Sequence, residues 1–91
     1  MKILAVCGMG LGSSLILKMN IEKAMDAEGI KGIVEVRDLS SIHGERADFI
    51  FASEEIAEKI EHSAQVYSVK NMTDKKEIKD KILEASQRGE N

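Results

Sequence analysis

Short apolar runs alternate with longer amphipathic stretches along this chain, and that alternation constrains its fold more than any other feature. The first run, Lys2–Val6, is continuously apolar after its lysine, as expected of a strand covered on both faces. Further strands are predicted at Ile33–Val36, Asp48–Ala52 and Gln65–Val69. Because strand–helix alternation produces parallel strands joined by right-handed crossovers, we expect one α/β domain over residues 1–91. Its four-stranded parallel sheet should have the order 2-1-3-4, with helices on both faces.

Helical spacing fills the intervals between the predicted strands. A first helix is predicted from Ser13 or Ser14 onward, and its inward residues are Leu17, Ile21, Ala24 and Met25. Ser53 is a suitable N-cap for a short second helix, and Thr73 or Asp74 for a third. Alternating strands and helices of this kind predict a Rossmann-like domain. The loop after its first strand, discussed below, is predicted to be a phosphatase-like P-loop.

Length, charge and composition exclude several functional classes. The chain has 91 residues, enough for one core, and its net charge of −3 with no Trp disfavours a nucleic-acid partner. No apolar stretch approaches the roughly 18 residues of a membrane span, and no signal peptide is recognisable, so we expect a cytoplasmic protein without membrane insertion. One cysteine and two histidines do not make a structural metal site. No metal or cofactor is expected.

The segment VCGMGLGSS, residues 6–14, places a thiol directly before three glycines and two serines. In parallel sheets, ligands bind beyond the carboxyl ends of the strands, where the strand order reverses. With the first strand central in the sheet, that point is the loop that begins at Cys7.

This loop has the composition of an anion cradle. Glycines allow successive backbone N–H groups to point inward, and the following helix adds unpaired N–H donors and the positive end of its dipole. The predicted phosphate-binding residues are Gly8, Met9, Gly10, Leu11, Gly12, Ser13 and Ser14. Such a cradle also favours a thiolate at Cys7, which suits nucleophilic phosphoryl transfer with Cys7 as the catalytic residue.

Other interpretations compete with this one. A cysteine at a strand end is often a small core residue, but the glycine loop and helix start in register with Cys7 favour a functional thiol. A dinucleotide-binding module is suggested by G-x-G spacing and by Asp38, yet 91 residues hold half of such a fold. A low-molecular-weight tyrosine phosphatase needs an arginine where this chain has Ser13, and no general acid is evident. A phosphocarrier remains as the third possibility.

The chain resembles the enzyme IIB components of the bacterial phosphoenolpyruvate-dependent sugar phosphotransferase system. The strongest match is ILAVCGMGLGSSLILKM, Ile3–Met19, with weaker matches at Ala47–Ser53 and Val69–Met72. Within the lactose/cellobiose-like IIB superfamily, the ascorbate type is nearer and the galactitol type is next. Residues Gly29–Arg46 carry no motif that matches.

The resemblance implies a function for the thiol. Cys7 would accept a phosphoryl group from the phosphohistidine of a IIA protein and pass it to a sugar, L-ascorbate, bound by the IIC membrane permease. Residues 8–14 would form the loop around that phosphocysteine. A monomer with small, transient interfaces is expected of such a shuttle.

Several polar residues outside the loop have no assigned role. The roles left open are those of Arg37, Asp38, His43, Arg46 and Asn71. The loop after the second strand could bring His43 toward Cys7, although a solvated surface position is favoured for both His43 and His62.

Overall fold

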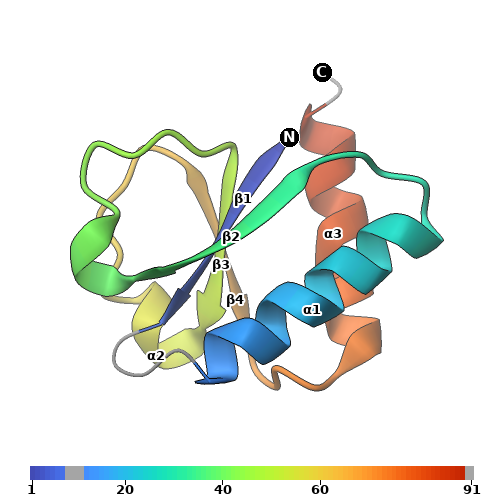
Figure 1. Cartoon of the computed structure of the whole chain (residues 1–91), viewed down its shortest axis with the longest axis horizontal. Helices are drawn as coiled ribbons and strands as arrows, with labels where there is room; N and C mark the ends of the chain where they lie inside the picture. Colours follow the sequence, from blue (N-terminus) through green and yellow to red (C-terminus); the bar gives the residue numbers. More distant parts are fainter. Residues whose placement is uncertain (8–11, 90–91) are drawn as a thin grey trace.

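The computed structural model describes residues 1–7 and 12–89, and its strands form one parallel sheet in the order β2-β1-β3-β4 (Figure 1). The strands are β1 (Lys2–Cys7), β2 (Ile33–Asp38), β3 (Phe49–Ser53) and β4 (Gln65–Val69). The predicted strand order and direction are confirmed. The boundaries differ slightly, because β1 and β2 continue pairing as far as Cys7 and Asp38, beyond the predicted ends. Strand β3 begins one residue later than predicted, at Phe49.

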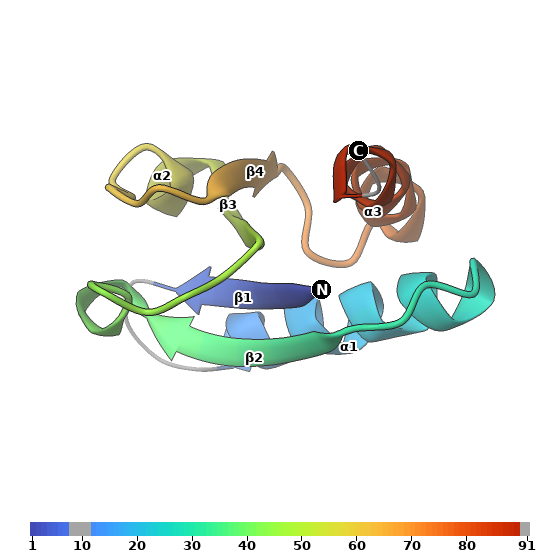
Figure 2. The same cartoon turned by 90° about the horizontal axis from the view of Figure 1, so that it is seen from above.

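Helices cover both faces of the sheet, as predicted. Helices α1 (Gly12–Ala27) and α3 (Lys75–Gly89) pack on one face, and the short helix α2 (Glu54–Ala57) packs on the other beside the 3₁₀ turn η1 (Leu39–Ser41). In Figures 1 and 2, α1 and α3 lie to the right of the view, and α2 and η1 lie to the left.

Side-chain oxygens predicted as N-caps accept hydrogen bonds at the starts of α2 and α3. The Ser53 hydroxyl accepts a hydrogen bond from Ile56 N at 3.4 Å, which confirms the predicted N-cap of α2. At α3, Asp74 takes the capping role, because its carboxylate accepts from Lys76 N and Glu77 N, both at 3.1 Å. Helix α1 begins at Gly12, slightly before the predicted start.

Strand β1 contributes to two hydrophobic clusters, one on each face of the sheet. Ile3 and Ala5 pack with α1 and α3, whereas Leu4 and Val6 face the side of α2. All four side chains are fully buried. This two-sided burial is the reason for the continuous apolar run near the N-terminus.

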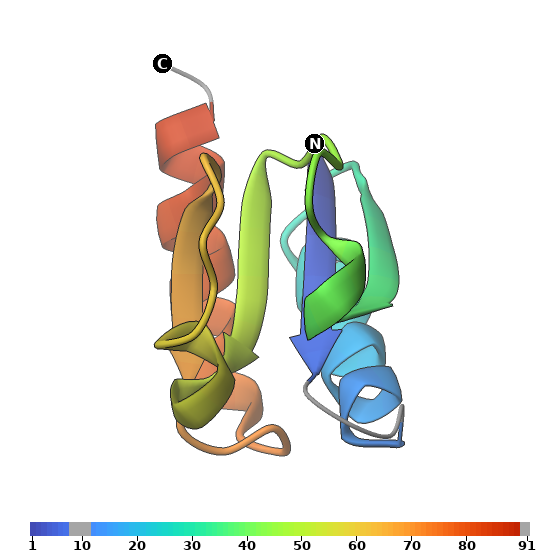
Figure 3. The same cartoon turned by 90° about the vertical axis from the view of Figure 1, so that its left-hand side faces the viewer.

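The carboxyl ends of the strands share one edge of the sheet, and Cys7 ends β1 there. Figure 3 shows β1 and β3 running to this edge, from which α1 then begins its return across the face. The sheet thus brings the thiol close to the start of α1.

Candidate functional site

Cys7 occupies the point where the strand order reverses. It is the last residue of β1 and pairs with Asp38 of β2, whereas pairing with β3 ends one residue earlier, at Val6 opposite Ala52. The side chain is only 5% exposed, and Sγ lies 3.9 Å from the carbonyl oxygen of Arg37. By strand alternation, Cys7 faces the side of the sheet that α1 and α3 cover.

The predicted cradle falls partly outside the described residues. Gly8, Met9, Gly10 and Leu11 lie in that undescribed part, and their predicted role stays a prediction. Gly12 and Ser13 belong to the first turn of α1, as the prediction of a helix N-terminus behind the loop requires.

Ser14 is the one buried polar residue identified in the described part of the chain. Its side chain is 1% exposed, and its hydroxyl has no hydrogen-bond partner among residues 1–7 and 12–89. A buried hydroxyl without a partner is unfavourable by about 1–3 kcal/mol. An unsatisfied donor therefore stands in the first turn of the helix that follows the Cys7 loop.

The Arg37 guanidinium is bound by two glutamates and a backbone carbonyl. Its Nε donates to Glu45 Oε1 at 2.9 Å, Nη1 donates to the Val36 carbonyl at 2.8 Å, and Nη2 pairs with Glu35. Hydrogen bonds to Glu45 and then Glu35 raise the pKa of Arg37. Because Arg37 pairs with Val6 in register, its side chain lies on the opposite face from that of Cys7.

Asp38 is engaged in the turn that follows β2. Its carboxylate accepts hydrogen bonds from the hydroxyls of Ser41 and Ser40, and these bonds lower the pKa of Asp38. Both hydroxyls belong to η1, so Asp38 stabilises this turn. The carboxylate that suggested ribose binding therefore has local partners.

The loop between β4 and α3 is held at the same edge of the sheet by side chains from two helices. Glu77 accepts hydrogen bonds from Lys70 N at 2.8 Å and Asn71 N at 3.1 Å, and Asn20 of α1 donates to the Met72 carbonyl at 2.7 Å. The Asn71 side chain accepts from Thr73 N at 2.9 Å. Asn71 thus shapes the loop, and the supports at Asn20 and Glu77 were not anticipated.

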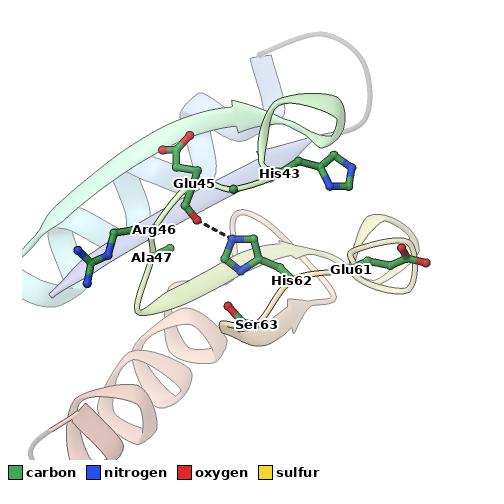
Figure 4. Close-up of a pocket in the computed structure, with 8 residues that line it drawn as sticks. His43, Glu45, Arg46, Ala47, Glu61, His62 and Ser63 are labelled. Atoms are coloured by element: carbon green, nitrogen blue, oxygen red, sulfur yellow. Dashed lines mark hydrogen bonds between the residues drawn. The ribbon is translucent and has the colours of Figure 1, made fainter.

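The two histidines and Arg46 line a different part of the molecule. A cavity of 350 Å³ lies between residues 43–47 and 61–63, the segments that lead into β3 and β4 (Figure 4). These segments cross from the carboxyl edge of the sheet, where His43 follows η1, back to the starts of β3 and β4, and His43 and Arg46 lie at opposite ends of the cavity (Figure 4). His43 and Arg46 are exposed, as favoured for His43, and both line this cavity together with His62.

His62 is a structural link, contrary to the solvated position favoured from the sequence. Its Nδ1 accepts a hydrogen bond from Ala64 N at 2.9 Å, so Nε2 carries the hydrogen and donates to the Glu45 carbonyl at 2.7 Å (Figure 4). The half-buried imidazole joins two segments that are distant in sequence, a pairing with no local sequence signal.

Residues 1–7 and 12–89 contain no group of three or more His, Cys, Asp or Glu side chains that could hold a metal ion. Within the same ranges, no helix is long and apolar enough to span a bilayer.

The fold and site define a class of protein: a small parallel α/β domain whose buried thiol stands at the switch point, ahead of a helix N-terminus. Residues 2–84 match the family described as the lactose/cellobiose-specific IIB subunit of the PTS system. The chain belongs to this family, which confirms the resemblance inferred from its residues.

Individual relatives agree with the family match. A Mycoplasma pneumoniae protein named "Ascorbate-specific PTS system EIIB component" is 32% identical over 81 residues, which cover 85% of each chain. Proteins of the same name from Salmonella choleraesuis and Escherichia coli O157:H7 are 36% identical over 87 residues, or 91% of this chain and 86% of theirs.

Proposed function

We propose that this chain is the phosphocarrier subunit of an ascorbate-type sugar phosphotransferase system, with Cys7 as its phosphorylated residue. The observation that carries the proposal is the position of Cys7, which ends the central strand at the switch point and faces the side that α1 covers. Membership of the IIB family supplies the reaction class.

The proposed reaction has two steps. The Cys7 thiolate attacks the phosphorus of a phosphohistidine on the IIA protein, so that an S–P bond forms while the P–N bond breaks and its electron pair returns to the imidazole. A sugar hydroxyl held by the IIC permease then attacks the same phosphorus. The S–P bond breaks, the thiolate is restored, and the hydroxyl proton is released to solvent or a base on the permease.

The loop is proposed to hold the phosphoryl oxygens during both steps. Residues 8–14 would supply backbone N–H groups, and the Ser14 hydroxyl would add a donor that has no partner in the described structure. Preorganised donors stabilise charge as it develops on a transferring phosphoryl group. This use would give the buried hydroxyl of Ser14 a function.

Transfer is favoured over hydrolysis by what surrounds the thiol. Ser13 stands where a phosphatase of the low-molecular-weight type has its arginine. Arg37, the nearest arginine along β2, is occupied by Glu45 and Glu35 on the other face of the sheet. Without the arginine of a phosphatase at position 13, the proposed phosphocysteine is suited to wait for an acceptor.

The proposed acceptor is L-ascorbate, because relatives along most of the chain are named ascorbate-specific. Galactitol is the alternative suggested by the resemblance. The proposed partners are a phosphorylated IIA protein and a IIC permease, which the chain would meet on the cytoplasmic side as a monomer.

The test is phosphoryl loading of wild type and Cys7→Ser. Each is incubated with the phosphorylated IIA protein of an ascorbate system, and the intact mass is measured. Wild type should gain one phosphoryl group and Cys7→Ser none, with unchanged circular dichroism. A phosphoryl adduct that persists on the variant at another residue would contradict the assignment, as would a wild-type protein that is never loaded.

A further inference from the structure

Helix α1 exposes large apolar side chains at the end that follows the Cys7 loop. Leu15, Ile16 and Met19 are 50%, 45% and 54% exposed, whereas Leu17 and Ile21 of the same helix are fully buried. Residues three and four positions apart are neighbours on a helix surface, so Met19 lies beside both Ile16 and Leu15. These three residues, here named the α1 patch, form an apolar surface on the outer side of the first two turns.

The outward side of α1 changes character along its length. Beyond the α1 patch, its exposed residues are the charged Glu22, Lys23 and Asp26 and the small Ala27. Single exposed apolar residues are ordinary on protein surfaces, but a cluster confined to one end of one helix indicates a contact surface. The end that carries the cluster is the end nearest the thiol, because α1 begins at Gly12, shortly after Cys7, and Leu15 lies in its first turn.

We propose that the α1 patch is the docking surface for the phosphohistidine protein that donates to Cys7. This inference rests on the proposed function. Cys7 is only 5% exposed, so a donor must press its histidine-bearing surface closely around the loop to bring phosphorus within reach of Sγ. A protein surface placed there also meets the first turns of α1.

The size of the patch fits a transient partner. A stable specific interface buries about 800 Å² on each partner and involves roughly 20–30 residues a side. Three half-exposed side chains cannot form a dimer interface of that kind, but they can form the centre of a small one. A donor must leave before the acceptor reaches the same thiol, so a small interface suits it.

Charge favours the donor over the permease. The segment Gly12–Met19 contains no acidic residue, and its one charged residue is Lys18. The cytoplasmic loops of membrane proteins carry an excess of Lys and Arg, which an acidic surface would complement. The α1 patch offers no such complement, whereas an apolar patch on a soluble donor would match it.

The experiment uses Met19→Lys and Leu15→Lys, with Ile33→Lys as the matched control. Ile33 is 60% exposed and begins β2 at the opposite end of the sheet from Cys7. Lysine has nearly the helix propensity of Leu and Met, so the α1 variants should fold. Two rates are measured: loading by phosphorylated IIA protein, and transfer from the preloaded protein to ascorbate in vesicles that contain the permease.

Met19→Lys and Leu15→Lys should each lower kcat/KM for loading about tenfold, as expected for residues central to an interface. Transfer to the sugar should stay at the wild-type rate, and Ile33→Lys should match wild type in both steps. Loading of both α1 variants at the wild-type rate would overturn the docking inference while leaving the proposed function intact. Normal loading with impaired transfer would overturn it in favour of the permease. Wild type that is never loaded would overturn the proposed function itself.

Discussion

Ser14 places at a buried position a hydroxyl group that has no partner among the described residues. The side chain is 1% exposed and unpartnered within the described residues, at the start of a helix in which alanine is intrinsically favoured over serine. Replacing an unsatisfied buried polar group with an apolar one of similar size is often neutral or stabilising. The Ser14 hydroxyl is therefore not expected to stabilise the fold, which agrees with its proposed use as a hydrogen-bond donor to phosphate.

We expect Ser14→Ala to separate stability from function. Its thermal midpoint should equal or exceed that of wild type, while its rate of phosphoryl loading falls roughly ten- to a hundredfold, since one lost donor to a charged group corresponds to about 1.5–3 kcal/mol. Thermal denaturation and intact mass against time measure the two effects. A clear loss of stability with normal loading would show instead that the hydroxyl is bonded within the protein.

Among the elements, the β4–α3 loop shows how side chains on helices position the carboxyl edge of the sheet. Glu77 of α3 accepts from two backbone N–H groups of this loop, and Asn20 of α1 donates to a third residue, Met72. Burial of Glu77 acts to raise its pKa, but the N–H groups of Lys70 and Asn71 and the charge of Lys81 outweigh it, so the pKa is lowered.

This lowered pKa makes a prediction about acid stability. A carboxyl group whose folded pKa is depressed stabilises the protein above its unfolded pKa, about 4.3 for Glu, and this contribution is lost as pH falls through the folded value. Glu77→Gln should therefore be less stable than wild type at pH 7 and lose less stability on acidification. Urea denaturation at pH 7 and pH 3 measures both.

The control for that prediction is Glu58→Gln, since Glu58 is exposed and lies outside the β4–α3 loop. It should retain the wild-type dependence of stability on pH. If Glu77→Gln were as stable as wild type at pH 7 and lost as much on acidification, the carboxylate would not be the anchor of the loop.

Sequence patterns were sufficient for the architecture because burial follows local periodicity. The two-sided β1 run and the inward residues of α1 and α3 indicated which surfaces meet, and β4 was predicted with its observed ends, Gln65–Val69. Strand ends were less predictable, since β2 extends to Asp38 only through pairing with Cys7.

The polar supports of the site region had no such pattern. Asn20 is 52 residues from Met72, and His62 is 17 residues from Glu45, so nothing local marks either pair. Arg37 illustrates the same limit, because its partner Glu45 lies eight residues away, beyond η1. Contacts of this kind follow from the tertiary fold.

For the whole molecule, the placement of the described arginines bears on the choice between a carrier and a hydrolase. Among the arginine side chains that the structure describes, Arg37 is bound to carboxylates and Arg46 lines the cavity near the start of β3. Neither is placed to hold a phosphoryl group on Cys7. This arrangement suits the proposed carrier, because hydrolysis would discharge the proposed phosphocysteine before its acceptor arrives.

We therefore expect negligible hydrolysis of p-nitrophenyl phosphate by the wild-type protein. A low-molecular-weight tyrosine phosphatase at equal concentration serves as the positive control, and release of p-nitrophenol is followed by absorbance. Robust turnover that disappears in Cys7→Ser would place the chain among the cysteine phosphatases instead.

The central position of β1 has a consequence for the working cycle. A strand bonded to neighbours on both sides, with four side chains fully buried, belongs to the part of a domain that opens only on global unfolding. Its last residue carries the proposed nucleophile, while the proposed recognition surface lies on the outside of a helix. Donor and acceptor can thus bind and dissociate at the surface of the domain without displacing β1. The position of the Cys7 sulfur then stays the same in both transfer steps.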